Sequence, residues 1–381
     1  MKKILSVLLI MTIMLLSCGM MASAVSNNAG ADALRGEFKA GDYIYDYYYY
    51  SPVKNTSDKT KYPVILWLHG QLSGDYKGHQ IRQSEVVYLA SDENQAKIKG
   101  TRGAYVLVPR FPTLSFSQAW DGNLSSVLTG GFKLAWTGES ANLKKFVDRF
   151  ISENRDNIDT DRIYVGGYSM GGKAAMKFAA TYPNYVAALF PTSSIYLLAS
   201  AESDLRSLIN TPTWFFTCQE DDFWGKPTPE SDDWTEFCKI SNRKDSIRWT
   251  QFTMNYGNDT GLLNYDGTRI KSLGYTEHNA WDPVLHDLVM LNGSIYPNIV
   301  STVDGNNSRV TLTPENSFLS WLSSQSLSGT IGDDSGNSGS GGNQSGGNSS
   351  SSGRVFYHVR EILEYIITLF DRMYKALFVV I

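Results

Sequence analysis

Short apolar runs of strand length recur along the middle of the chain, separated by segments with helical signals. These runs cover residues 64–68, 104–108, 163–165, 186–190, 213–217 and 247–253. Apolar strands that alternate with helices are typical of a mostly parallel sheet covered on both faces. The pattern therefore predicts an α/β fold, with a mostly parallel central sheet and helices on both of its faces.

Two further segments carry periodic signals. Residues 139–154 predict a helix that packs on the sheet, because apolar side chains recur there at three- and four-residue spacing, at Leu143, Phe146, Val147, Phe150 and Ile151. Residues 36–52 are rich in tyrosine and in other residues that favour strands, so they predict strands and are compatible with a hairpin.

The N-terminus carries the pattern of an export signal. Two lysines precede an uncharged apolar run over residues 4–16, so residues 1–24 are predicted to be a signal peptide and the protein to be secreted or held at a bacterial cell surface. The cleavage site has two interpretations, a lipobox ending at Cys18 and an ordinary small-residue site at residues 22–24. An uncleaved anchor is less favoured, because the apolar run is shorter than the ~20 residues of a span.

The C-terminal part changes composition twice. Residues 326–353 consist mainly of Ser, Gly, Asn and Asp, which bury too little apolar surface to fold, so they predict a flexible linker. Residues 354–381 are apolar with a polar stripe of near-helical period. They predict an amphipathic helix that contacts a membrane surface or a partner, with packing on the preceding domain as the alternative. Residues 25–325 remain as the folded domain.

Composition narrows the possible partners. The 381-residue chain has a formal net charge of -4 and no basic stripe interleaved with aromatics, so no nucleic-acid partner is expected. Aromatic residues make up 13% of the chain, which suits a core and also a cleft with flat apolar walls. Cys218 and Cys238 either pair in an oxidising compartment or remain buried thiols. No His/Cys spacing indicates a metal site, and no cofactor is expected.

Ser169 is the candidate nucleophile. It stands in Gly167-Tyr168-Ser169-Met170-Gly171, a G-x-S-x-G pattern that follows a strand-like stretch and opens a helix-like one. A serine hydroxyl is a poor nucleophile at neutral pH, so it needs a sharp strand-to-helix turn where a base can reach it and N–H groups can bind an oxyanion. The alternative, a solvated serine in a glycine-rich turn, is disfavoured by the flanking strand and helix.

The acid is expected on a later loop, because in chains of this architecture the nucleophile comes first, the acid next and the histidine last. The loop after residues 213–217 holds two adjacent aspartates. Asp221 is preferred to Asp222 as the carboxylate that orients the imidazole, although acidic pairs in loops are more often simply solvated.

His278 is the candidate base among the five histidines. It lies in a loop that leads into a helix predicted to have Asp282 as its N-cap and Pro283 in its first turn. His286 is expected inside that helix in a structural or surface role. The other three are less suitable because of their positions: His69 ends a predicted strand, His79 lies in a polar stretch, and His358 lies beyond the linker.

An acyl-transfer site also needs two donors for the oxyanion. The backbone N–H of Met170 is assigned as one donor, and the backbone of Gln71, with Gly70 close behind, as the other. His69 is then structural. Four tryptophans are candidate walls of the substrate cleft: Trp120, Trp136, Trp224 and Trp281.

With Leu68-His69-Gly70, the run 167–172, an acid loop and His278-Asn279-Ala280-Trp281 in place, the chain resembles the α/β-hydrolases. More narrowly, it is similar to secreted esterases of the feruloyl esterase, polyhydroxybutyrate depolymerase and phospholipase/carboxylesterase groups. The resemblance covers about residues 36–325 and implies a serine acyl-enzyme mechanism without a metal. The relatives' H-G-x-x-D at the acid loop is replaced here by Thr217-Cys218-Gln219-Glu220-Asp221.

The sequence therefore predicts a secreted serine carboxylesterase, with acetyl or feruloyl esters of plant polysaccharide as the favoured substrates. Two alternatives stay open. One is a serine peptidase of the prolyl oligopeptidase type, which shares the fold and the triad. The other is a non-catalytic binding module on a hydrolase scaffold, which is disfavoured because every triad position is filled.

Overall fold

The fold is described from a computed structural model of the chain. It describes residues 34–40, 43–70, 88–110, 140–194, 206–219, 221, 232–253, 259–263, 269–271, 281–289, 294–296 and 298–329. These residues belong to one compact unit, Met1–Ile331. The predicted signal peptide, nearly all of the linker and the C-terminal helix lie outside the described residues, so those assignments stay predictions. Within the described part, no helix is long and apolar enough to span a bilayer.

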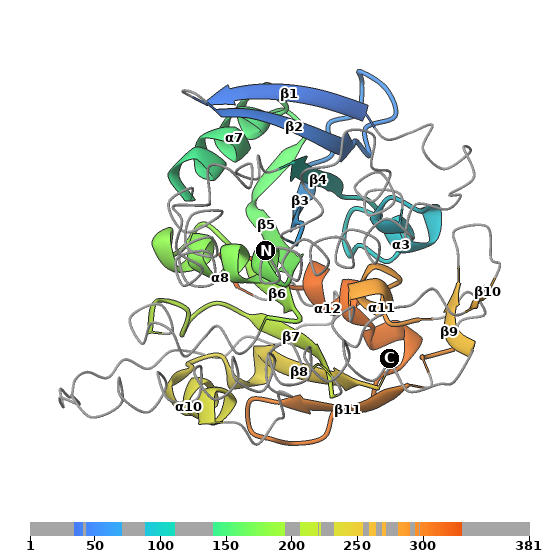
Figure 1. The fold of residues 1–381 in the computed structure, drawn as a ribbon. Coiled ribbons are helices and arrows are strands. Elements are labelled where there is room, and N and C mark those ends of the chain that lie inside the picture. The colour runs from blue at the N-terminus through green and yellow to red at the C-terminus, as the bar shows by residue number, and fades with distance from the viewer. Residues whose placement is uncertain are drawn as a thin grey trace, which may run out of the picture. The chain divides into compact units, whose positions relative to one another are not determined.

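A nine-stranded sheet forms the centre of the fold, in the order β1-β2-β4-β3-β5-β6-β7-β8-β11 (Figure 1). All neighbours from β4 to β8 pair in parallel. The hairpin of β1 and β2 pairs antiparallel at one edge, and β11 does so at the other. The strands are β1 (Leu34–Ala40), β2 (Tyr43–Tyr50), β3 (Tyr62–Leu68), β4 (Tyr105–Arg110), β5 (Ile158–Tyr168), β6 (Ala188–Thr192), β7 (Thr213–Cys218), β8 (Ile247–Phe252) and β11 (Ile299–Asp304), with β9 (Asp259–Leu263) and β10 (Arg269–Lys271) in a separate pair.

The mostly parallel sheet confirms the predicted fold class. Each apolar run corresponds to a strand, and the tyrosine-rich segment forms the hairpin. β3 and β7 are buried at every position, which explains why their sequences are continuously apolar rather than alternating.

Helices cover both faces of the sheet (Figure 1). On one face α7 (Ser140–Glu153), α8 (Met170–Thr181) and α10 (Asp232–Ile240) enclose one hydrophobic cluster. On the other face α11 (Trp281–Leu285), α12 (Phe318–Ser323) and the residues flanking α3 (Asp92–Ala96) enclose a second. The predicted apolar stripe of α7 is buried at Leu143, Phe146, Val147 and Phe150. Two short 3-10 turns complete the elements, η5 (Lys244–Ser246) and η6 (Pro314–Asn316).

The two cysteines are free, buried thiols. Cys218 belongs to the second hydrophobic cluster and Cys238 to the first, so they lie on opposite faces of the sheet. Burial raises the pKa of Cys238 to about 12. The sequence left open either a disulfide or two buried thiols, and the structure shows two buried thiols.

The helix near the predicted base differs from the expectation at both ends. α11 begins at Trp281, so Asp282 lies inside its first turn and is not the N-cap. It ends at Leu285, so His286 lies in the turn that follows and not inside the helix. The early end has a physical cause, because the backbone enters the left-handed region at Asp287 and Leu288, with φ of 61° and 60°.

Arg162 joins three segments at the start of β5, and its loss should lower stability. Its guanidinium donates to Asp159 Oδ2 at 2.6 Å and to the carbonyls of Lys99 and Lys61 at 3.1 and 3.2 Å, and the residue is 5% exposed. Arg162→Ala is expected to lower the free energy of unfolding by about 2–3 kcal/mol, because charged hydrogen bonds are lost at a buried position. Urea denaturation measures this.

Arg149→Ala is the matched control, since Arg149 also pairs with a carboxylate, Glu153 at 2.6 Å, but both side chains are about half exposed. Its expected effect is below about 0.5 kcal/mol. Equal losses in the two variants would contradict the role assigned to Arg162.

Candidate active site

Ser169 occupies the turn between β5 and α8. Its backbone has φ 55° and ψ -119°, a conformation that a residue with a side chain adopts only when its surroundings enforce it. The Ser169 N–H donates to the carbonyl of Thr192 at 2.8 Å, and its own carbonyl accepts from Lys173 N at 3.2 Å. The strand before it and the helix after it thus hold the serine at a sharp, strained turn. This is the geometry that the G-x-S-x-G pattern predicted.

The glycines of this turn lie against the end of β3. A Cβ on Gly171 would clash with the carbonyls of Leu68 and His69, and a Cβ on Gly167 would clash with the Leu68 carbonyl and with Gly171. Both obstacles are backbone atoms, which cannot swing aside as a side chain could. The first turn of α8 therefore packs directly on the β3 backbone, and only glycine fits at these two positions.

Two of the predicted oxyanion donors, Met170 and Gly70, flank this contact, and their role stays a prediction. Met170 is the first residue of α8, where the backbone N–H groups of a helix lack intrahelical partners and the helix dipole favours negative charge. Gly70 follows the end of β3, and a Cβ there would meet the ring of Tyr168, next to the nucleophile. His69 is fully buried, and its Nδ1 lies 2.6 Å from the Gly70 carbonyl, to which it donates as the Nδ1–H tautomer. Gln71 lies outside the described residues.

Asp221 lies just after β7 and is fully buried. Its N–H donates to the carbonyl of Cys218 at 3.2 Å, and Gln219 N donates to Phe252 O at 2.9 Å, which fixes the loop to β8. Because β5, β6 and β7 are adjacent and parallel, their carboxyl ends meet at one edge of the sheet. The structure therefore brings Ser169 and Asp221 to the same edge. Asp222 and His278 lie outside the described residues.

An aromatic stack joins the nucleophile to the segment of the predicted base. Tyr168 stacks between two tryptophans, with ring centroids 6.3 Å from Trp67 and 5.4 Å from Trp281. Trp281 follows His278 at the third position along the chain, so the stack brings the segment that comes after the predicted base to the end of β5, next to Ser169. Trp281 itself is 6% exposed, packed in the second hydrophobic cluster. The other predicted wall residues, Trp120, Trp136 and Trp224, lie outside the described residues, and the wall role stays a prediction.

Three hydroxyl residues beside the turn were not predicted from the sequence to belong to the site. Thr192 ends β6, the strand between β5 and β7, and Ser193 and Ser194 follow it; each of the three is at most 1% exposed. Among the described residues, their hydroxyls are buried without a hydrogen-bond partner. Ser193 has φ 51°, and a Cβ on Gly172 in the first turn of α8 would clash with Ser194 Oγ. The sequence carried a signal for these residues, since three polar positions stand at the end of an apolar strand, at the edge of the sheet that holds Ser169.

Of the two roles that the sequence left open for His286, structural or surface, the structure favours the structural one. Its ring lies 4.3 Å from that of Tyr88, centroid to centroid, on the side of the sheet that α3 covers. Burial, with a smaller effect of the Lys97 charge, lowers its pKa to about 4. A histidine that stays neutral throughout the physiological range and packs on an aromatic ring fits a structural role better than that of a catalytic base.

A parallel sheet, a serine on a strained strand-to-helix turn and a buried carboxylate two strands away define an α/β-hydrolase with a serine nucleophile. The chain matches the family model named Esterase over residues 45–264, more than half of its length. It therefore belongs to the Esterase family, which confirms the expected class of ester hydrolase. In the described part, no group of three His, Cys, Asp or Glu side chains is placed to hold a metal ion.

Solved structures show weaker likenesses. A thermostable esterase is 21% identical over 67% of this chain and 60% of its own, with a TM-score of 0.46. An acylaminoacyl peptidase from Pyrococcus horikoshii is 14% identical over 59% and 37%, with a TM-score of 0.38, and a ferulic acid esterase is 14% identical over 57% and 89%, with a TM-score of 0.39. The chain thus spans less than two thirds of the first two, and these scores carry no weight for activity. No curated protein matches the chain.

Gly171→Ala tests the contact between α8 and β3. The new Cβ has to push the first turn of α8 away from Leu68, which displaces the Met170 N–H from the predicted oxyanion position. The rate of Ser169 labelling by a fluorophosphonate should fall by about 100-fold or more, the cost of losing one oxyanion donor. Thr181→Ala, at the exposed far end of the same helix, is the control and should label at the wild-type rate. A normal rate in Gly171→Ala would refute the close approach.

His286→Phe tests the structural role of that histidine. A pKa of about 4 in the folded state, against about 6.5 in the unfolded chain, means that the unfolded state binds more protons between these values. Stability should therefore fall as the pH falls through this window. Between pH 7 and pH 5 the wild type should lose about 1–2 kcal/mol more than His286→Phe. Denaturation at both pH values measures this, and parallel losses would contradict the buried, neutral histidine.

Proposed function

We propose that the protein is an exported serine carboxylesterase that hydrolyses esters through an acyl-enzyme on Ser169. The observation that carries the proposal is the strained turn at Ser169, held against the end of β3 by two glycines. Such strain persists only where surrounding contacts enforce it and is concentrated at functional sites. Membership of the Esterase family supports the same chemistry.

In the proposed reaction Ser169 Oγ attacks the ester carbonyl while His278 takes the hydroxyl proton. The tetrahedral oxyanion accepts hydrogen bonds from the N–H of Met170 and from the loop after β3, at Gln71 or Gly70. His278 then gives the proton to the leaving alcohol, and a serine acyl ester remains. Water attacks the acyl ester by the same route and regenerates the free serine. Asp221 holds the tautomer of His278 and stabilises its charged form.

The proposed substrates are acetyl or hydroxycinnamoyl esters of plant polysaccharide. Export, predicted from residues 1–24, would bring the enzyme to such polymers, and the high aromatic content suits sugar and phenolic rings. The chain between Thr192 and Pro212 is too short for the large lid of an interfacial lipase, which favours an open cleft. The helix of residues 354–381 would add contact with a membrane surface or the cell envelope.

Replacing the triad residues tests the mechanism. Ser169→Ala should abolish fluorophosphonate labelling and lower kcat on p-nitrophenyl acetate by about 10⁴–10⁶-fold. Asp221→Asn should lower kcat by about 10⁴-fold, because the imidazole loses its orienting partner. Asp161→Asn is the control, an exposed aspartate at the far end of β5, and should keep wild-type kcat. A folded wild type that is not labelled would instead indicate a binding module.

Substrate class is decided by assaying the wild type on feruloylated xylan, acetylated xylan, tributyrin and a prolyl peptide amide. Release of ferulate or acetate at rates above those on tributyrin supports the proposal. Activity on tributyrin alone would overturn the substrate class, and cleavage of the amide in preference to esters would favour a peptidase.

A further inference from the structure

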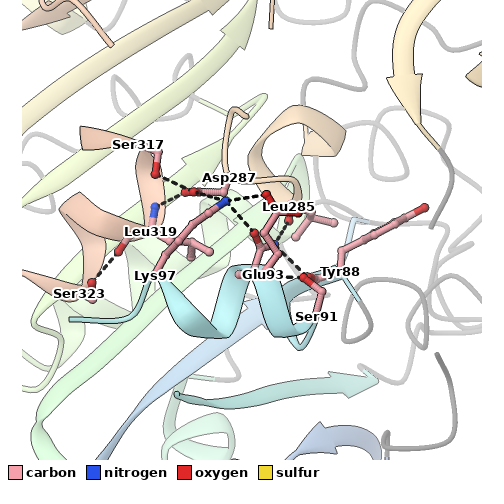
Figure 2. Close-up of polar contacts among 10 residues, drawn as sticks. Tyr88, Ser91, Glu93, Lys97, Leu285, Asp287, Ser317, Leu319 and Ser323 are labelled. Carbon is pink, nitrogen blue, oxygen red and sulfur yellow. Dashed lines mark hydrogen bonds and ion pairs between the residues drawn. The ribbon is translucent and has the colours of Figure 1, made fainter. Parts of the chain in front are cut away.

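A buried ion pair lies among the elements that cover the second face of the sheet. Lys97 Nζ is 3.1 Å from Asp287 Oδ2, and the Asp287 side chain is fully buried. The same carboxylate accepts a hydrogen bond from Ser317 Oγ at 2.6 Å and one from the Leu319 N–H (Figure 2). Two segments distant in sequence therefore converge on a single charged group in the turn after α11.

Neighbouring contacts attach the same turn to α3. Asn94 Nδ2 donates to the carbonyl of Leu285, the last residue of α11, at 3.0 Å, and to that of Tyr88 at 2.9 Å. The Tyr88 ring in turn packs on His286. We call Asn94, Lys97, Asp287 and Ser317 the anchor cluster. It fixes the carboxyl end of α11 between α3 and the start of α12.

The backbone at the anchor cluster has a strained conformation that requires stabilising contacts. Asp287 and Leu288 both have positive φ although neither is glycine, and each such residue costs on the order of 1 kcal/mol. Their N–H groups donate back to Val284 and Pro283 at 2.9 and 2.8 Å, which closes the helix. A five-residue helix forms few backbone hydrogen bonds, so without the carboxylate contacts little would hold the turn after α11 in place.

Stability alone does not explain a buried charge here. Burial raises the pKa of Asp287, and Lys97 opposes this, as expected for a carboxylate removed from water. Replacing a buried ion pair by apolar side chains of similar volume is often neutral or stabilising, so such a pair is weak evidence for a role in stability. A charged group with several hydrogen-bond and ion-pair partners instead restricts the segment to a single geometry.

We propose that Lys97 and Asp287 are positioning residues that fix α11 and, through it, the chain that leads to the predicted base His278. The helix is held at both ends, at its start by the Trp281–Tyr168 stack beside Ser169 and at its end by the anchor cluster. The predicted base stands three positions before Trp281 in the sequence. The part of this inference that concerns His278 rests on the proposed function.

The test uses the full-length protein with Lys97→Met, Asp287→Asn and the double variant Lys97→Met/Asp287→Leu. In the single variants, kcat on p-nitrophenyl acetate should fall about 10–100-fold with KM within about twofold of wild type, the size of effect that a misplacement of about 1 Å produces. Lys97→Arg should recover kcat to within about threefold. Amide hydrogen exchange should rise at least about tenfold in peptides covering 281–289, and remain unchanged in β5 and α7.

Two controls remove a similar charge where no positioning is expected. Glu93→Gln takes away the exposed partner of the same lysine, at 3.5 Å, and Lys144→Met breaks an exposed pair with Asp148. Both should keep wild-type kcat and exchange. The double variant should unfold at the wild-type temperature and still have a low kcat, which a merely structural role would not produce.

Three results would overturn the inference. They are unchanged exchange at 281–289 in the single variants, exchange that rises throughout the molecule together with the loss of kcat, and full kcat in the stable double variant. Failure of the proposed function is distinguishable, because it appears as a wild type that a fluorophosphonate does not label. In that case the exchange data still decide whether the anchor cluster holds α11.

Discussion

The active-site arrangement depends on one close approach, between the first turn of α8 and the carbonyl end of β3. The Leu68 carbonyl occupies the space where side chains at Gly167 and Gly171 would lie. This contact packs the first turn of α8 on the end of β3, and the strained turn at Ser169 lies directly before that helix, at the carboxyl edge of the sheet. The rest of the fold supplies partners to that point, since the parallel order of β5, β6 and β7 brings the acid strand to the same edge.

The two faces of the sheet make different contributions. The face under α7, α8 and α10 is an apolar core that supports the nucleophile helix. The face under α11 and α12 combines an aromatic stack with buried polar contacts, and it carries the chain toward the predicted base. Ser169 and the predicted acid Asp221 thus follow strands of the sheet itself, whereas the predicted base stands in the segment before a short helix that side chains contact at both ends.

Local patterns made the fold predictable. The strands were evident because continuous burial leaves a continuous apolar run, and the positions after such runs led to Ser169 and Asp221 as candidates, which the structure places at one edge of the sheet. The end of α11 was not predictable, because a left-handed backbone at Asp287 depends on partners far along the chain. Asn94 and Leu285, for example, meet across 191 positions. Thr192, Ser193 and Ser194 were visible in the sequence as polar residues at the end of a buried strand, but the burial of their hydroxyls is set by neighbouring strands and was not predictable.

The shortness of α11 has a consequence for how the protein responds to heat. A helix of five residues contributes few backbone hydrogen bonds of its own, whereas the central strands share theirs with neighbours on both sides. Local opening of that helix therefore requires less free energy than melting of the sheet. The enzyme is expected to become inactive, reversibly, at temperatures where its circular dichroism and its tryptophan core still report an intact fold.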